Sequence, residues 1–310
     1  MQLIRGHYNL RPEHHGCVAT IGNFDGVHLG HVAVLERLAE KSREFGLPAT
    51  VITFEPTPLE YFMGDNAPAR LTRFREKYEL LRDHGLDRMF CLTFDANLAH
   101  MPASEFIDRV LVQGLGIRYL VVGDDFRFGR DRAGDFDTLT AAGQRHGFEV
   151  VNMHTYVAHD GRVSSTRVRQ ALAGNDLQLA AHLLGRHYSV RGKVVHGDKR
   201  GRTIGFPTAN VLLRRKVCPV SGVYAVDIPC LGDQPVQGVA NVGKRPTVGG
   251  TRVQLEVHLF DYEGSLYGRE VEVRFLHHIR PERKFDSFDA LKQQILTDCD
   301  AAKAWFETPM

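Results

Sequence analysis

The chain has 310 residues, of which 43% are apolar and 25% charged, and its formal net charge at pH 7 is +2. This length predicts about two domains, and the composition is that of globular proteins rather than of disordered chains. A net charge so close to zero argues against nucleic-acid binding driven by bulk electrostatics. The five cysteines are scattered and include no CxxC pair, which argues against a disulfide framework or a structural zinc site.

The first residues, MQLIRGHYNLRPEHHG, lack the apolar core of a secretion signal. No apolar run approaches the ~20 residues that a membrane-spanning helix needs. We therefore expect a cytoplasmic protein with no membrane partner and no nucleic-acid partner, in a reducing compartment that keeps its cysteines as thiols.

The first half of the chain alternates between strand and helix patterns. Short apolar or β-branched runs are followed by segments in which apolar residues recur at helical spacing. Such alternation predicts an α/β fold, with a parallel sheet covered on both faces and ligands at the carboxyl ends of its strands. The predicted strands are 17–21, 49–54, 88–94, 118–122 and 148–154, and the predicted helices are 31–45, 73–84, 103–112 and 136–146.

The pattern changes from about Gly185 onward. Short alternating runs follow one another with Gly and Pro turns and little helix, which predicts an all-β antiparallel sheet or small barrel. A final helix over 287–306 carries apolar residues along one side. We place the hinge at 184–187, so the expected domains are 1–185 and 186–310. The predicted strands are 189–195, 222–229, 236–242, 253–261 and 269–276.

The first predicted strand runs into GNFDGVHLGH, residues 22–31, where a helix begins. Glycines permit a tight turn, and the N–H groups at a helix N-terminus favour anions. His28 and His31 are three residues apart, so both can face a triphosphate and stabilise charge that develops at its α-phosphorus. Metal binding and ordinary packing are the alternatives, although no neighbouring Cys or carboxylate completes a metal site. The candidate phosphate-binding residues of the turn are Gly22, Asn23 and Phe24.

Two further runs of the first half carry candidate ligand groups. In SSTRVR, residues 164–169, hydroxyl and guanidinium groups precede a predicted helix, where they suit a leaving pyrophosphate or, alternatively, form an ordinary N-cap. GDDFRFG, residues 123–129, ends a predicted strand, and its phenylalanines either stack on a flat ligand ring or fill the core. The candidates are Ser164, Ser165, Thr166 and Arg169 for phosphate, and Asp125, Phe126 and Phe128 for a ring-shaped ligand.

The most informative stretch of the chain is GDKRGRTIGFPTAN, residues 197–210. Glycines four apart let backbone N–H groups surround an anion, and the intervening basic side chains can neutralise phosphate charge. The Thr and Asn that follow offer neutral oxygens, which Mg²⁺ accepts alongside phosphate oxygens. A glycine-rich surface loop is the alternative for the glycines alone. The stretch predicts a Mg-nucleotide site at Gly197, Lys199, Gly201, Gly205, Pro207, Thr208 and Asn210.

A predicted strand near residue 256 contains a candidate catalytic carboxylate. Leucine and valine occupy one face of this strand, whereas Glu256 shares the other with Gln254 and His258. A carboxylate held in place can accept the proton of a hydroxyl nucleophile. A solvent-exposed strand face is the alternative.

These motifs together resemble the prokaryotic bifunctional riboflavin kinase/FMN adenylyltransferases, also called FAD synthetases. The resemblance covers nearly the whole chain, in the family's domain order. One departure is Thr57, where many members have a histidine, so a third histidine contact to phosphate is not expected here. GNFDGVHLGH, FEPTP (54–58), GDDFRFG and SSTRVR resemble the adenylyltransferase module, and GDKRGRTIGFPTANV, SGVYAV (221–226), GVANVGKRPTV (238–248) and LEVHLFDYEGSLYGRE (255–270) resemble the kinase module.

The resemblance implies a Rossmann-like nucleotidyltransferase domain followed by a six-stranded antiparallel β-barrel with a terminal helix. It implies that ATP phosphorylates riboflavin to FMN, and that a second ATP adenylylates FMN to FAD with release of pyrophosphate. The expected ligands are therefore ATP, riboflavin, FMN, FAD and Mg²⁺. The residues that the resemblance assigns are Glu256 as catalytic base, His28, His31 and Ser164–Thr166 at the ATP phosphates, and Thr208 and Asn210 at Mg²⁺. The candidates for flavin contacts are Asp125, Phe126, Phe128 and Arg280.

The two implied reactions make different demands on the protein. The ribityl hydroxyl of riboflavin must lose a proton, which suits Glu256 as a base. The phosphate of FMN is already largely dianionic at neutral pH and needs no base, and none is obvious in 22–31. Two other classes stay open from the residues alone: a nucleotidyltransferase with another phosphate acceptor, and a flavin- or nucleotide-sensing regulator. Chromatography of the flavins formed from riboflavin, ATP and Mg²⁺ separates these classes.

Overall fold

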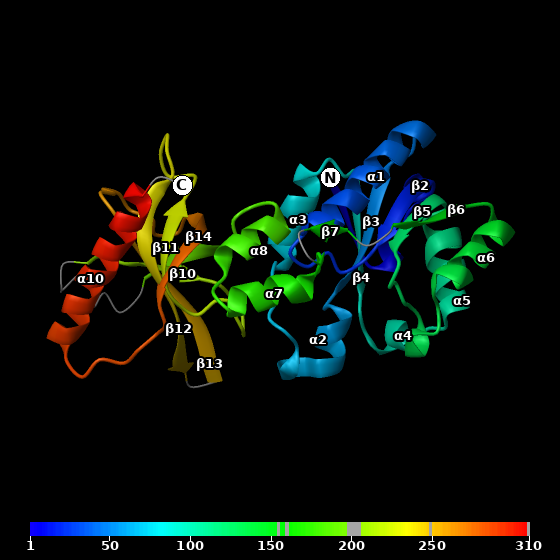
Figure 1. Cartoon of the computed structure of the whole chain (residues 1–310). Coiled ribbons are helices and arrows are strands. Elements are labelled where there is room, and N and C mark those ends of the chain that lie inside the picture. The colour runs from blue at the N-terminus through cyan, green and yellow to red at the C-terminus, as the bar shows by residue number, and fades with distance from the viewer. Residues whose placement is uncertain (154–155, 159–160, 197–205, 248–249, 309–310) are drawn as a thin grey trace. The chain divides into compact units, whose positions relative to one another are not determined.

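The structure is a computed structural model, and the chain divides into two compact units (Figure 1). The first unit comprises Met1–Pro68 and Thr72–Ser164, and the second comprises Ala69–Leu71 and Ser165–Met310. Three residues of the second unit, Ala69–Leu71, therefore lie in the sequence between two segments of the first unit. The residues that the structure describes are 1–153, 156–158, 161–196, 206–247 and 250–308.

A six-stranded parallel sheet forms the centre of the first unit, in the order β1-β4-β3-β2-β5-β6. Every residue of β2 is buried, as expected for a parallel strand with helices on both faces. The sequence pattern predicts five of these strands and misses β1, which is too short to show a period. The strands are β1 (Gln2–Arg5), β2 (Cys17–Ile21), β3 (Ala49–Glu55), β4 (Arg88–Thr93), β5 (Ile117–Gly123) and β6 (Glu149–Met153).

Helices cover both faces of this sheet (Figure 1), and the longer ones bury apolar side chains against it. On one face, Leu35 of α1 and Leu81 of α3 pack against the strands. On the other face, Ile107 and Leu139 do the same. The predicted parallel α/β fold is therefore confirmed. The helices are α1 (Leu29–Phe45), α2 (Pro58–Met63), α3 (Phe74–Asp83), α4 (Ala96–Ala99), α5 (Ala103–Phe106) with a π-helical continuation over Ile107–Gly114, and α6 (Phe136–His146).

A closed antiparallel barrel forms the centre of the second unit, in the order β10-β13-β12-β11-β14-β9. Alternate residues face its interior: Val190 and Val194 of β9 are buried, as are Leu255 and Val257 of β13. The predicted barrel is confirmed, and the structure adds β10 within the glycine-rich stretch. The strands are β9 (Ser189–Val195), β10 (Ala209–Leu212), β11 (Gly222–Ile228), β12 (Val236–Thr247), β13 (Gly250–Leu259) and β14 (Glu270–Arg280).

The terminal helix α10 (Phe288–Glu307) packs against the outside of the barrel. Its residues Cys299 and Ala302 are buried against Val223 and Ala225 of β11. Residue 223 also lines the pocket described below, so this packing places α10 along one wall of that pocket.

Two helices, α7 (Ser165–Ala173) and α8 (Leu177–Leu184), belong to the same unit as the barrel. The hydroxyl of Tyr224 donates to Oδ1 of Asn175, in the turn between these helices, at 2.7 Å. The guanidinium of Arg215, which is buried, donates to the carbonyl oxygen of Arg70 at 2.8 Å. The hydrogen bond from Arg215 therefore joins residues 69–71 to the unit that contains the barrel.

Candidate active sites

The turn between β2 and α1 places two histidine rings together at a helix N-terminus. His28 is the N-cap of α1, and its Nδ1 accepts a hydrogen bond from the backbone N–H of His31 at 3.3 Å. The two rings stack with centroids 3.6 Å apart. Because Nδ1 accepts this bond, the neutral ring of His28 carries its proton on Nε2. Gly30 allows the arrangement, since a Cβ there would lie 3.2 Å from Nδ1 of His28.

Buried hydrogen bonds hold the backbone of this turn in shape. Phe24 and Val27 have φ angles of 48° and 43°, which side-chain-bearing residues adopt only where their surroundings enforce it. The carboxylate of Asp25 accepts from the N–H of Thr72 at 2.9 Å, and the hydroxyl of Thr72 accepts from the N–H of Gly26 at 2.9 Å. The one acidic side chain in 22–31 is therefore engaged in fixing the loop.

The predicted phosphate-binding residues Gly22, Asn23 and Phe24 form the first part of the turn. The ring of Phe24 lies 4.9 Å from that of His31, measured between centroids, and a Cβ on Gly22 would come within 3.0 Å of it. The side-chain oxygen of Asn23 is buried and has no hydrogen-bond partner in the described part of the chain. A buried oxygen in this condition suits a site that a ligand completes.

Thr57, which stands where many family members have a histidine, caps α2. Its backbone N–H and its hydroxyl both donate to the carboxylate of Glu60 at 2.9 Å. The N–H of Glu60 donates in return to the hydroxyl oxygen of Thr57 at 3.4 Å, which completes a capping box that stabilises the first turn of the helix. Position 57 thus has a structural role in this chain.

The predicted phosphate contacts in SSTRVR fall on both sides of the division between the units. Ser164 is the last residue of the first unit, whereas Ser165, Thr166 and Arg169 belong to α7 in the second. The Nε of Arg169 donates to the carbonyl oxygen of Ala69 at 2.6 Å. Arg169 therefore helps to hold residues 69–71, and the phosphate contacts of this run remain predictions.

The candidates for ring binding in the first unit follow β5. Asp125 forms an exposed ion pair with Arg162, with 2.5 Å between Oδ2 and Nη2. The rings of Phe126 and Phe128 lie nearly parallel with centroids 5.5 Å apart. Phe128 is buried against Phe106 and is part of the core, which is the alternative that the sequence left open.

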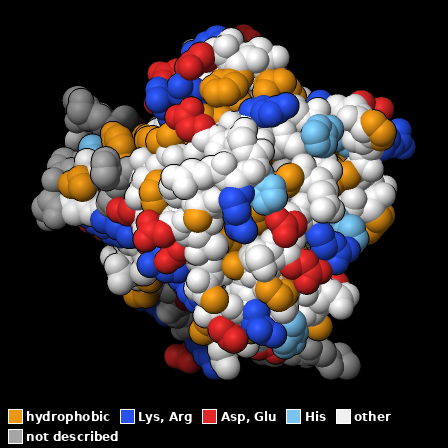
Figure 2. Space-filling model, turned by 90° about the vertical axis from the view of Figure 1, so that its right-hand side faces the viewer, with side chains coloured by type: hydrophobic (Ala, Val, Ile, Leu, Met, Phe, Trp, Pro, Cys, Tyr) orange, Lys and Arg blue, Asp and Glu red, His pale blue; other side chains and the backbone are white. Residues whose placement is uncertain are grey.

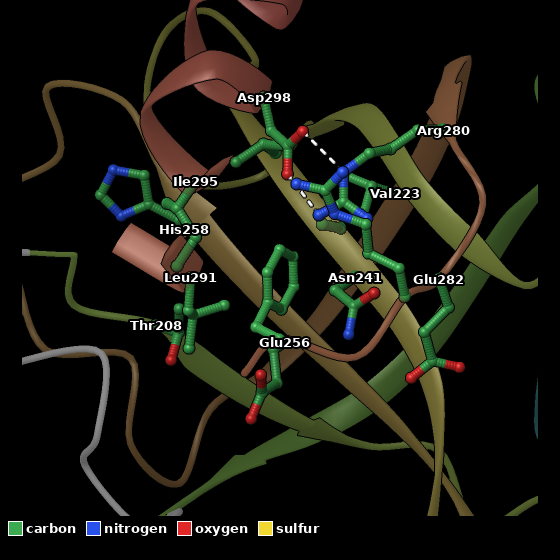
Figure 3. A pocket seen from close by; sticks show the side chains of 14 residues that line it. Thr208, Val223, Asn241, Glu256, His258, Arg280, Glu282, Leu291, Ile295 and Asp298 are labelled. Carbon is green, nitrogen blue, oxygen red and sulfur yellow. Dashed lines mark hydrogen bonds and ion pairs between the residues drawn. The ribbon is translucent and has the colours of Figure 1, made fainter. Parts of the chain in front are cut away.

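A pocket lies between the barrel and its terminal helix (Figure 3). Its empty volume is about 750 Å³ with the open mouth included. Glu256, Asn241 and Thr208 lie at one end, and the pair of Arg280 and Asp298 lies at the other. Its apolar walls are Val223, Val239, Leu291 and Ile295.

Glu256 lies on β13 between two amide-bearing strands. It pairs in register with Asn210 of β10 and Asn241 of β12. The side-chain amide of Gln254 donates to Oε1 of Glu256 at 2.8 Å and to Oδ1 of Asn210 at 2.8 Å. One amide therefore orients both the predicted base and a predicted metal ligand. The predicted alternation of β13 is confirmed, because Leu255 faces the barrel core.

His258, two residues beyond Glu256, holds the segment that leads into β10. Its Nδ1 lies 3.0 Å from the carbonyl oxygen of Pro207, so Nδ1 carries the proton and donates. Pro207 and Thr208 are thereby tied to the strand that carries Glu256. The other predicted phosphate residues of the stretch, Gly197, Lys199, Gly201 and Gly205, lie outside the described residues.

Arg280, predicted as a flavin contact, forms a two-point ion pair with Asp298 of α10. The distances are 2.8 Å from Nε to Oδ1 and 2.7 Å from Nη2 to Oδ2. Asp298 is 4% exposed, and it also accepts from the amide of Gln294. A buried pair with this fork geometry gives rigid orientation as well as charge balance. It ties the end of β14 to α10 at the rim of the pocket.

Asn241, Glu282 and Asp298 line the pocket but were not singled out from the sequence. Asn241 lies in GVANVGKRPTV, and its place beside Glu256 follows only from the register of β12 against β13. Asp298 lies on a helix whose sequence reads as an ordinary amphipathic one. No local spacing connects the three residues, and the motif that contains Asn241 does not by itself indicate that its side chain faces the pocket.

Two negative findings and one view of the surface concern the described residues. They contain no group of three or more His, Cys, Asp or Glu side chains placed to hold a metal ion. No helix among them is both long enough and apolar enough to cross a membrane. Acidic and basic side chains are intermixed over the face that Figure 2 shows, with no single basic stripe.

Comparisons with known proteins agree along the whole chain. A family model described as FAD synthetase matches residues 10–167, and one described as riboflavin kinase matches residues 184–306. Proteins named bifunctional riboflavin kinase/FMN adenylyltransferase are similar to nearly the full chain. The relative from Escherichia coli K12 is 53% identical over 99% of this chain and 98% of its own. That from Haemophilus influenzae is 51% identical over 99% and 100%.

One solved structure is also similar over the full length. It is a crystal structure described as a macrolide-efflux protein from Streptococcus pneumoniae. It matches with a TM-score of 0.83 and 32% identity, covering 98% of this chain and 100% of that one. Its description concerns the Streptococcus protein alone.

Proposed function

The chain belongs to the family of bifunctional riboflavin kinase/FMN adenylyltransferases, and we propose here how its residues divide the two reactions. Its function is flavin cofactor biosynthesis: ATP phosphorylates riboflavin to FMN, and a second ATP adenylylates FMN to FAD with release of pyrophosphate. The observation that carries the residue assignment is the hydrogen-bonded group of Glu256, Gln254 and Asn210 beside the pocket between the barrel and α10.

The kinase reaction takes place in the pocket between the barrel and α10. Glu256 accepts the proton of the ribityl hydroxyl as that oxygen attacks the γ-phosphorus of ATP. Gln254 holds the carboxylate in one orientation, which keeps the base in line with its target. The apolar walls suit the flavin ring, and Arg280, fixed by Asp298, is its polar neighbour.

Magnesium is the cofactor that we propose for this step. Thr208 and Asn210 would hold the ion through a hydroxyl and an amide oxygen, both hard ligands of the kind that Mg²⁺ takes alongside phosphates. The donor set fits, since the register places Asn210 directly beside Glu256. When bound, the ion would neutralise charge on the phosphates of ATP, which Gly197, Lys199, Gly201, Gly205 and Pro207 would surround.

The test of the magnesium assignment is Asn210→Ala. FMN formation should fall, and the Mg²⁺ concentration for half-maximal kinase activity should rise. FAD formation from supplied FMN should continue, because that reaction does not use Asn210. An unchanged Mg²⁺ requirement in a folded variant would remove Asn210 from the metal site.

Adenylyl transfer takes place at the turn of 22–31 (the histidine turn). His28 and His31 donate hydrogen bonds to the triphosphate at the N-terminus of α1, where the helix dipole adds to their effect. Ser164, Ser165, Thr166 and Arg169 are proposed to stabilise the leaving pyrophosphate. The phosphate of FMN attacks without a protein base, and Asp125 and Phe126 are its proposed flavin-side neighbours.

The proposed domains are 1–185 for adenylyl transfer and 186–310 for the kinase. The test is a fragment beginning at Gly185, which we expect to form FMN, compared with one beginning at Ser165. The longer fragment keeps α7 and α8, including the bond from Tyr224 to Asn175, and should unfold at a higher temperature. If neither folded fragment phosphorylates riboflavin, the kinase needs the first unit and the proposed division is wrong.

We also propose a cytoplasmic location. All five cysteines, each within the described part of the chain, are thiols. Thiols persist in a reducing compartment, where ATP is also available. Immunodetection after cell fractionation tests this, and recovery in an extracytoplasmic fraction would contradict it.

The direct test of the whole assignment is to incubate the protein with riboflavin, ATP and Mg²⁺ and to separate the flavins by chromatography. FMN should appear first and FAD second. Omission of riboflavin and addition of FMN should give FAD alone. Absence of FMN from the first mixture would contradict the kinase assignment.

A further inference from the structure

A buried lysine lies directly beneath the histidine turn. Lys77 is on α3 and is 1% exposed. Its Nζ donates to the carbonyl oxygen of Asn23 at 2.8 Å and to the hydroxyl of Thr53 at 3.3 Å. Lysine is among the residues least often fully buried, because its ammonium group loses its hydration there. Both partners of Nζ are oxygen acceptors, which match the N–H donors of a lysine ammonium group, so these hydrogen bonds hold that group behind the turn.

The hydrogen bond from Lys77 fixes one peptide group of the turn. The carbonyl of Asn23 and the N–H of Phe24 belong to the same peptide, which is trans. In a trans peptide these two groups point in opposite directions. With its carbonyl directed at Lys77, this peptide presents the N–H of Phe24 on the side away from the buried ammonium.

The backbone conformation at Phe24 is consistent with an N–H group that is held in one direction. Phe24 has a φ of 48°, which a bulky side chain rarely adopts. Its own ring packs against His31, and the side-chain oxygen of Asn23 is buried without a partner among the described residues. The strained backbone therefore lies between a buried cation and the two stacked histidine rings.

We propose that Lys77 is a positioning residue for adenylyl transfer. Its ammonium group holds and polarises the Asn23–Phe24 peptide, so that the N–H of Phe24 donates to a phosphate oxygen of ATP. This inference rests on the proposed role of the histidine turn. It assigns a role to the ammonium group of Lys77, which does not contact the substrate itself. A polarised N–H is a stronger donor, and a fixed one binds without reorganisation.

The first test replaces the charge while keeping the length. Lys77→Met should lower kcat/KM for ATP in FMN adenylylation by about 10- to 100-fold, the equivalent of one hydrogen bond to a charged group. The KM for FMN should change less than about twofold, since the defect is confined to the ATP phosphates. Lys77→Gln keeps an N–H donor without the charge, so it should give an intermediate loss. Riboflavin phosphorylation in the same samples should be unchanged. Its rate serves as the control for the concentration of correctly folded second unit.

A matched control separates this role from simple packing. Leu81 is fully buried on the same helix, and Leu81→Ala should lower the melting temperature through a cavity. The KM for ATP should stay unchanged in that variant. If Lys77→Met alters the kinetics of adenylylation no more than Leu81→Ala does, Lys77 only fills space and the proposal is wrong.

A second measurement removes the N–H itself and decides the matter if Lys77→Met does not fold. Replacement of Phe24 by phenyllactic acid, through nonsense suppression, converts that amide into an ester and keeps the side chain. The KM for ATP in adenylylation should rise by at least about 10-fold. An unchanged KM would overturn the proposal. If His28→Ala also leaves FAD formation intact, the role of the whole turn fails; if His28→Ala abolishes it, only the role of Lys77 fails.

Discussion

The two candidate sites use opposite chemistry around a phosphate. In the histidine turn, the acidic side chain, Asp25, is engaged with Thr72, and the groups at the helix N-terminus are imidazoles and backbone N–H donors. In the barrel pocket, a carboxylate on a strand is held by neighbouring amides. In the proposed assignment, the difference follows from the attacking group, which is an ionised phosphate in one case and a neutral hydroxyl in the other.

The comparison teaches that the acidity of the nucleophile decides whether a nucleotide site needs a carboxylate. A site that joins two anions gains from donors and positive charge and would be impaired by a second negative group. A hydroxyl kinase must in addition remove a proton. A substitution that removes the carboxylate of one site or an imidazole of the other should therefore affect one reaction and spare the other.

The largest effect is expected from Glu256→Gln. The amide keeps the shape of the side chain but accepts no proton, so riboflavin phosphorylation should fall by about 10²- to 10⁴-fold. FAD formation from supplied FMN should be unchanged. The two rates are measured on one preparation by chromatography. A kinase rate within threefold of the parent would show that the hydroxyl loses its proton elsewhere.

His28 provides the reciprocal test. His28→Ala should reduce FAD formation by about 10²- to 10³-fold, as for loss of a donor to transition-state charge, and spare FMN formation. Because His28 is also an N-cap, His28→Asn is the matched control, since asparagine caps helices well. His28→Asn should restore the melting temperature without restoring the rate. Equal loss of both activities in a folded variant would contradict separate sites.

Gln254→Leu should have a smaller effect within the kinase site. It removes the bonds to Glu256 and Asn210 but leaves both groups in place. The kcat of riboflavin phosphorylation should fall about tenfold, equivalent to roughly one hydrogen bond to a charged group. Stopped reactions at saturating riboflavin and ATP measure it. If only the KM for riboflavin changed, Gln254 would be a binding group rather than an orienting one.

Arg280→Lys tests the rim of the same pocket. Lysine keeps the charge but loses the two-point contact with Asp298, which is nearly buried. The melting temperature should drop by a few degrees, and the KM for riboflavin should rise a few-fold. The KM for ATP is the control and should stay constant. A rise in both would place Arg280 near the nucleotide instead.

The smallest effect concerns two buried thiols, one in each unit. Burial raises the pKa of Cys17 to about 11, and it raises the pKa of Cys299 to about 11 as well. At pH 8 both are therefore protonated and unreactive, whereas the exposed Cys230 should be alkylated first by iodoacetamide. Peptide mass spectrometry over time measures the order. Rapid modification of Cys299 would show that α10 opens readily.

The local parts of both sites are predictable from sequence, and the assembled parts are not. GNFDGVHLGH is continuous, so its glycines and histidines predict a turn that the structure places at the start of α1. The alternation around Glu256 likewise predicts its face on β13. Asn241 and Asp298 reach the pocket only through the register of β12 and the packing of α10, which depend on long-range contacts.

The same distinction holds for the fold. Most strands and helices are predictable because their apolar residues recur at regular spacing over five residues or more. β1 and β10, each four residues long, do not, because a strand so short is defined by its partners. The role of Thr72 is also not predictable from sequence. Its hydrogen bonds to Asp25 and Gly26 shape the histidine turn, although it lies 46 residues or more away in the chain.

The three residues 69–71 carry a consequence for how the two activities are joined. Their carbonyl groups are held by Arg169 and by the buried Arg215, although the residues on either side belong to the first unit. The polypeptide thus crosses between the units three times, and one cleavage cannot separate them cleanly. A gene split at one point would give a barrel whose Arg215 has lost these acceptors. A fragment that begins at Ser165 or Gly185 should therefore unfold at a lower temperature than the second unit of the whole chain, because Arg215 lacks the carbonyl acceptors that residues 69–71 supply.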